Sequence, residues 1–138
     1  MRHVHAFGDD ALGDLDAVGL ADALRDGRVG RAELVEAAIA RTEAVDPVLN
    51  GLAYAAFQQA RDAAEGKPAD GFFGGVPTFI KDNIDVAGQP TMHGTDAWTP
   101  WHAVGNSEFT ELFLATGLTS VGKTQLSEFG FSASAEHP

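Results

Sequence analysis

A lysine in the middle of the chain has surroundings that could suit it to proton transfer. Lys81 follows the strand-like residues 78–80, and the glycines and proline of Gly74–Pro77 constrain the backbone before them. If burial removes water from the ammonium, the charged form is destabilised and the neutral amine becomes a general base. Asp82 and Asp85 favour the charged form, and a surface lysine paired with either would be an ordinary strand end. Lys81 is therefore a candidate base whose protonation state the sequence leaves open.

A second motif, Gly117–Thr124 (GLTSVGKT), has the letters of a phosphate-binding loop. Such a loop needs a strand before it and a helix after it, so that curled backbone N–H groups surround the phosphates. Here the residues before Gly117 predict a helix and Leu118–Val121 predict a strand. The pattern favours a helix, a glycine stop and a strand over a nucleotide-binding module.

The composition is that of a globular chain of about one domain, and it excludes several classes of function. The 138 residues are 44% hydrophobic and 21% charged. A net charge of -11 repels nucleic acid, so we expect no nucleic-acid partner. The absence of cysteine excludes disulfides, thiolate metal sites and cysteine nucleophiles. Because no signal peptide or membrane-spanning stretch stands out, we expect a cytoplasmic protein without a membrane partner.

Hydrophobic periodicity predicts helices in the first half of the chain. Apolar spacing behind a cap at Asp16 predicts a helix as far as Arg25. An apolar stripe predicts a second helix over Arg31–Val45, which Asp46-Pro47 should end. A short extended stretch over residues 49–54 and a third helix over residues 55–65 follow.

The second half of the chain predicts strands and one helix. β-Branched and aromatic residues predict strands over residues 78–81 and 83–86. A cap at Asn106 or Ser107 predicts a helix through Ala115, followed by the short strand Leu118–Val121. We therefore expect an α/β fold, with a helical segment over residues 1–70 and a strand-helix part over residues 71–138 whose sheet is incomplete in this chain.

Three collinear blocks resemble the amidase signature family. Gly75–Asn83 (GVPTFIKDN) resembles its G-V-P-x-x-x-K-D-N block. Pro90–Thr95 (PTMHGT) resembles the next block, with Thr95 where many members have serine. Gly122–Phe129 (GKTQLSEF) resembles the G-K-T-N-x-x-E-F block, with Gln125 replacing the usual asparagine. The helical first half also resembles the amino-terminal part of the family, so the likeness covers nearly the whole chain.

The resemblance implies the amidase signature fold and catalysis by two serines and a lysine, a variant of the serine triad. On that mapping Lys81 is the general base during acylation and returns the proton to the leaving amine. Phe129, Gly130 and Phe131 would border the acyl pocket, although these aromatic residues could equally belong to the core. The implied substrate is a small-molecule amide, and the implied mechanism needs no metal or other cofactor.

The resemblance also implies that the glycine- and serine-rich block with both catalytic serines lies beyond Pro138. The serines that this chain contains lack that glycine-rich context: Ser107, Ser120, Ser127, Ser132 and Ser134. We therefore predict that the complete protein cleaves carboxamide bonds and that this amino-terminal part alone is inactive. A complementing carboxy-terminal chain or a homodimer partner would cover the incomplete sheet.

Three alternatives stay open at this point. The complete protein could be the amide-transferring subunit of a tRNA-dependent amidotransferase. The chain could be the nucleotide-binding module that Gly117–Thr124 suggests by its letters, or an inert remnant that associates through an exposed sheet edge. His93, His102 and His137 do not have the spacing of a zinc site, so we expect no metal centre.

Overall fold

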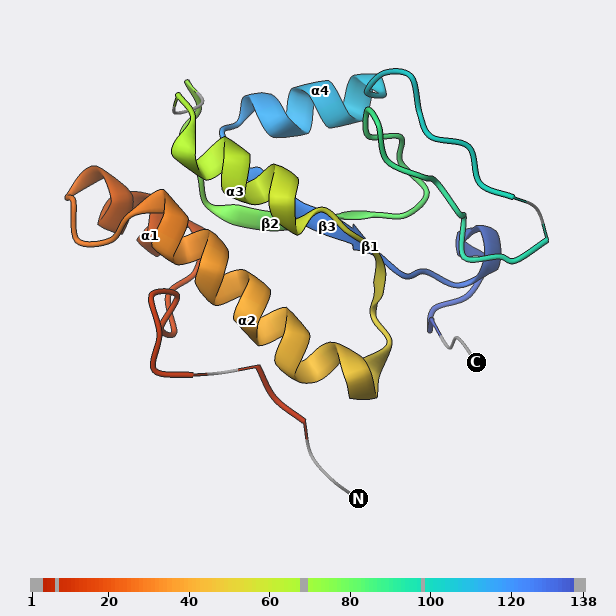
Figure 1. Ribbon diagram of the computed structural model, residues 1–138, viewed down its shortest axis with the longest axis horizontal. Helices are drawn as coiled ribbons and strands as arrows, with labels where there is room; N and C mark the ends of the chain where they lie inside the picture. Colours follow the sequence, from red (N-terminus) through yellow and green to blue (C-terminus); the bar gives the residue numbers. More distant parts are fainter. Residues whose placement is uncertain (1–3, 7, 68–69, 98, 136–138) are drawn as a thin grey trace.

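The structure is a computed structural model that describes residues 4–6, 8–67, 70–97 and 99–135. Its elements in chain order are α1 (Ala17–Arg25), α2 (Arg31–Leu49), β1 (Leu52–Ala55), α3 (Phe57–Glu65), β2 (Pro77–Lys81), α4 (Glu108–Ala115), β3 (Thr119–Thr124) and the 3₁₀ turn η1 (Glu128–Gly130) (Figure 1). Two helices come first and the three strands then alternate with α3 and α4, which confirms the predicted α/β class.

The three strands form one mixed sheet in the order β1-β3-β2. β1 runs antiparallel to β3, whereas β2 runs parallel to it. The register between β2 and β3 shifts after Thr78, so that Phe79 lies opposite Gly122 and Lys81 lies opposite Thr124. β3 is therefore the central strand, and the outer edges of β1 and β2 have no strand partner among the described residues.

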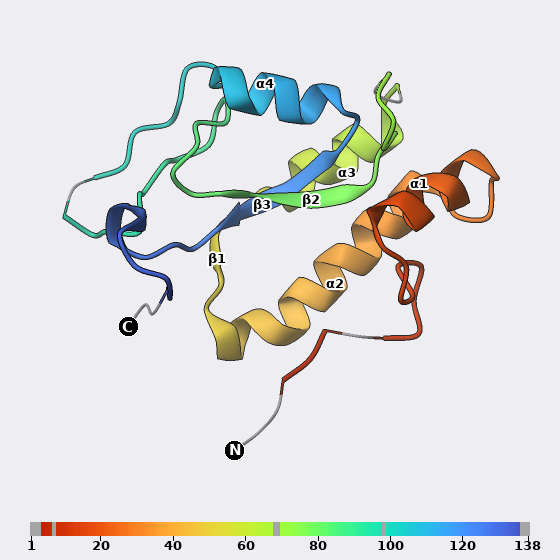
Figure 2. The ribbon, with the colours of Figure 1, turned by 180° about the vertical axis from the view of Figure 1, so that it is seen from behind.

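Helices and loops cover the two faces of the sheet differently. α2 and α3 pack on one face, where Val35, Ile39 and Ala60 form a core cluster with Val121 of β3. α4 lies on the opposite side of the sheet from α2, together with the long connection between β2 and α4 (Figures 1 and 2). The carboxyl ends of β2 and β3, where Lys81 lies, are next to this long connection.

The predicted amino-terminal helices are confirmed, with one error at the end of the second. The Asp16 side chain caps α1 by accepting a hydrogen bond of 2.8 Å from the Gly19 N–H. α2 does not end before Pro47 but continues to Leu49. Proline fixes φ near the helical value, so in the last turn it costs one hydrogen bond without breaking the helix. The helix ends instead at Asn50, which adopts a left-handed conformation with φ of 46°.

The predicted strand over residues 83–86 is wrong. The chain turns directly after β2, where the Ile84 N–H donates to the Lys81 carbonyl at 3.2 Å. The turn forms because the Asp82 side chain is fully buried and its carboxylate bonds to groups on other segments. A carboxylate anchored in this way holds the backbone out of a continuing strand.

The segment with phosphate-loop letters is a helix end and a strand, as expected, but the strand runs beyond the predicted end at Val121 to Thr124. Ser107 caps α4, which ends before Gly117, and β3 follows as extended backbone. Gly117 has a φ of 96°, and a Cβ there would lie 2.5 Å from the Gly74 nitrogen. A Cβ on Gly122 would lie 2.3 Å from the Tyr54 carbonyl oxygen. Both glycines are therefore explained by close backbone contacts, and the extended strand between them does not have the curled backbone of a phosphate site.

Candidate active site

Lys81 is the last residue of β2 and its side chain is exposed to solvent. Burial of the amine, the condition under which Lys81 would become a general base, is therefore not met within this chain. Side chains alternate along a strand, so Lys81 lies on the same face as Phe79, which packs toward α2. Neither neighbouring carboxylate pairs with it, because Asp82 pairs with Lys123 and Asp85 accepts a hydrogen bond from Thr91. Lys81 is thus an exposed amine at the end of an ordered strand.

The buried lysine of this region is Lys123 on β3, which lies opposite Ile80 and on the other face of the sheet from Lys81. Its Nζ atom donates to the Pro90 carbonyl at 2.7 Å and to Thr91 Oγ1 at 2.9 Å. The same Nζ lies 2.7 Å from Asp82 Oδ1 in an ion pair whose two side chains are both 0% exposed. A buried ammonium is tolerated because a carboxylate, a carbonyl and a hydroxyl surround it.

The connection over Pro90–Thr95 covers Lys123. The Met92 N–H donates to Asp82 Oδ2 at 2.9 Å, and the His93 N–H donates to the Asp82 carbonyl at 3.1 Å. Asp82 therefore holds the loop through its side chain and its backbone at once. We call this side, with Ile80, Asp82 and Lys123 under the loop, the closed face, and the side with Lys81 and Thr124 the open face.

The predicted pocket residues lie next to this loop. The Phe129 N–H donates to the His93 carbonyl at 2.8 Å, and the two rings stack with centroids 6.4 Å apart. Thr95 Oγ1 donates to Glu128 Oε1 at 2.6 Å and ties the same two segments together. Phe129 is 44% exposed and Phe131 is 91% exposed, so in this chain they are surface residues and not core.

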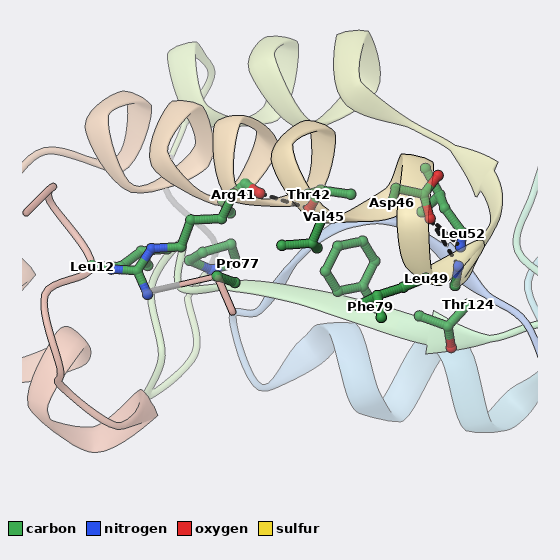
Figure 3. A pocket seen from close by; sticks show the side chains of 13 residues that line it. Leu12, Arg41, Thr42, Val45, Asp46, Leu49, Leu52, Pro77, Phe79 and Thr124 are labelled. Carbon is green, nitrogen blue, oxygen red and sulfur yellow. Dashed lines mark hydrogen bonds between the residues drawn. The ribbon is translucent and has the colours of Figure 1, made fainter. Parts of the chain in front are cut away.

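An apolar groove lies on the open face between α2 and the sheet (Figure 3). Its volume is about 390 Å³. Val45 and Leu49 of α2 face Phe79 of β2 across it, and Thr124, the partner of Lys81 in the sheet, borders one end. The remaining lining residues are Ala6, Leu12, Ala38, Arg41, Thr42, Asp46, Gly51, Leu52 and Pro77.

The other candidate groups do not assemble into a site with Lys81. Ser107 is the cap of α4, and Ser127 bonds to Ser132 in the carboxy-terminal turn. Over the described residues no three histidine, aspartate or glutamate side chains come together as metal ligands, and His3 and His137 lie outside the described residues. No described helix has the length and apolar character that crossing a membrane requires.

Sequence reasoning missed Lys123 as a structural partner because it stands in the Gly-Lys-Thr letters of a nucleotide motif. The signal available in the sequence was Asp82 directly after one predicted strand and Lys123 close to the end of another. The pairing depends on the strand register, which the sequence does not state.

The family of this chain follows from its match to a protein-family model. A family model described as Amidase matches residues 33–138. The chain belongs to the amidase family. This confirms the resemblance carried by the three sequence blocks, and both Lys81 and Lys123 fall within the matched amidase region.

Individual relatives agree with the family match. The chain is 73% identical to the protein AmiC of Mycobacterium tuberculosis (strain ATCC 25618 / H37Rv), over 100% of this chain and 29% of AmiC. It is 32% identical to a glutamyl-tRNA(Gln) amidotransferase subunit of Renibacterium salmoninarum, over 89% of this chain and 25% of that protein. The structure of 6-aminohexanoate cyclic dimer hydrolase matches with a TM-score of 0.78 at 32% identity, over 88% of this chain and 26% of that one. The amidase chain thus spans less than a third of the length of each of these relatives.

Proposed function

We propose that this chain supplies the general base, Lys81, of an enzyme that hydrolyses carboxamide bonds in small molecules. The observation that carries the proposal is an exposed amine, without an acidic partner among the described residues, at the end of an ordered strand in an amidase fold. An amine that is bonded to a carboxylate inside the protein cannot meet a serine hydroxyl, whereas an exposed amine without such a partner is accessible to one. Lys123 fails this criterion because its Nζ lies 2.7 Å from a carboxylate oxygen.

In the proposed reaction a serine hydroxyl attacks the amide carbonyl and its proton passes through a second serine to the Lys81 amine. The resulting tetrahedral intermediate expels the amine, which takes the proton back from Lys81, and water then releases the acid from the acyl-serine. Both serines come from polypeptide outside this chain. The open outer edges of β1 and β2 support the idea that further polypeptide completes the sheet.

We also propose that Phe129, Gly130 and Phe131 border the acyl pocket. The hydrogen bonds from His93 to Asp82 and from Phe129 to His93 link this turn to the residue after Lys81. The exposed rings of Phe129 and Phe131 would then be covered by substrate or by completing polypeptide.

The test is amide hydrolysis by a full-length protein that begins with this chain. Lys81→Ala should lower kcat/KM by about 10²- to 10⁴-fold, the usual contribution of a general base. The matched control is Lys67→Ala, because Lys67 is also an exposed lysine, and its ion pair with Asp70 is long, at 4.0 Å, and solvent-exposed. The 138-residue chain alone should release no product. Full activity of Lys81→Ala in the complete protein would refute the role of Lys81.

The amide-transferring alternative has one observation in its favour, the 32% identity to an amidotransferase subunit. It predicts that the full-length protein releases ammonia from glutamine and transfers it only when partner subunits are present. Hydrolysis of simple amides by the purified protein, with no response to partner subunits, would exclude it.

A further inference from the structure

Lys123 is the largest fully buried side chain of the described residues, and the proposed chemistry does not use it. Its ammonium has three oxygen neighbours: the Asp82 carboxylate at 2.7 Å, the Pro90 carbonyl at 2.7 Å and the Thr91 hydroxyl at 2.9 Å. Packing alone does not require such a group, because apolar residues of similar volume often stabilise a core as well as a buried ion pair does. The charge therefore calls for a reason other than stability.

The two residues of the ion pair are the sequence neighbours of Lys81 and of its strand partner. Thr124, the residue after Lys123, is the strand partner of Lys81, and Asp82 follows Lys81 directly. The Asp82 N–H donates to the Thr124 carbonyl at 3.0 Å. Lys123, Thr124 and Asp82 thus form a closed ring of contacts, made by the peptide bond between Lys123 and Thr124, the hydrogen bond from Asp82 to Thr124, and the ion pair. Lys81 is joined to this ring through its peptide bond to Asp82.

The ring is also fixed from the closed face. Asp82 accepts the Met92 and His93 N–H groups, and Thr91 donates to Asp85 Oδ1 at 2.6 Å. The backbone on both sides of Lys81 is held while its side chain stays exposed on the open face. A strand that ends at an outer edge would otherwise fray at this residue.

We propose that the buried Lys123–Asp82 ion pair positions the backbone of Lys81 so that its amine meets the reacting groups in one fixed place. This inference rests on the proposed function of Lys81. Lys123 and Asp82 are positioning residues, because they act through Lys81 and do not contact the reacting atoms. An error of about 1 Å in the placement of a catalytic group can lower a rate about 100-fold.

The experiment measures kcat and KM of amide hydrolysis in the full-length protein for Lys123→Met, Lys81→Ala and the double variant. Lys123→Met should lower kcat about 100-fold while KM changes less than about threefold. Because the pair acts through Lys81, the double variant should be no slower than Lys81→Ala alone. Val121→Ala is the matched control, since it removes buried volume on the same strand and should lower the unfolding midpoint without lowering kcat.

The possible outcomes are distinct. A full-length Lys81→Ala that keeps its activity refutes the proposed function, whatever Lys123 does. If Lys81→Ala is impaired but Lys123→Met keeps the wild-type kcat, or if the two losses multiply in the double variant, the positioning role is overturned. Asp82→Asn keeps the shape of the side chain without its charge and replaces Lys123→Met if that variant does not fold. If Asp82→Asn also fails to fold, the pair is a folding requirement and the positioning inference is wrong.

Discussion

Two lysines on neighbouring strands have opposite environments on the closed and open faces of the sheet. Lys123 on the closed face is fully buried and surrounded by oxygen atoms, whereas Lys81 on the open face is exposed and lies away from both nearby carboxylates. The two residues are one register position apart in the same parallel strand pair. Strand alternation therefore places the two lysines on opposite faces of the sheet.

If Lys81 has the proposed role, burial by itself does not identify a catalytic lysine. A buried ammonium needs an anionic partner to be stable, and that partner occupies the amine. The proposed role of Lys81 needs an exposed amine, because the nucleophile and substrate must be able to reach it by replacing water. The comparison can be tested by perturbing each face in turn.

The largest effect should come from removing the partner of the buried lysine. Asp82→Ala leaves the Lys123 ammonium unpaired inside the protein and should destabilise the fold by about 3–5 kcal/mol. Lys81→Ala on the open face should change stability by less than about 0.5 kcal/mol, because its side chain is exposed. Urea unfolding followed by circular dichroism measures both. Equal losses in the two variants would mean that the faces do not differ as the structure shows.

A smaller effect should come from the loop that covers the closed face. Gly94 has a φ of 68°, and a Cβ there would lie 2.3 Å from the Leu126 carbonyl oxygen. Gly94→Ala should therefore cost more than about 2 kcal/mol, from backbone strain and steric overlap together. Gly88→Ala is the matched control, because Gly88 has a φ of 75° but open space around its Cβ position. It should cost about 1–2 kcal/mol from backbone strain alone. If the two variants lose the same stability in thermal unfolding, the loop does not pack against Leu126 as described.

The sequence predicted the helices and the strand β2 well, because caps and apolar periodicity act locally, but it predicted only the first part of β3. The neighbours of Asp16 assign it as a cap, and for α4 they leave a choice between Asn106 and Ser107, of which the structure has Ser107. The turn after Lys81 and the burial of Lys123 could not, because both depend on an ion pair between residues far apart in the chain, Asp82 and Lys123. The sequence blocks pointed to Lys81 by resemblance, but they do not state its exposure, which depends on the face of the sheet that the side chain occupies.

The smallest effect should come from the open face, where Arg41 borders the groove and holds Asp10 of the amino-terminal segment. The hydrogen bond from the Arg41 guanidinium is the main cause that lowers the pKa of Asp10 below its ordinary value. A carboxyl whose pKa is lower in the folded state adds stability above its unfolded pKa of about 3.9, and this stability is lost as pH falls through the folded pKa. Asp10→Asn should therefore cost about 1 kcal/mol at neutral pH and almost nothing near pH 2, measured by urea unfolding at both pH values. A cost that is the same at both pH values would show that the Asp10 charge does not stabilise the open face.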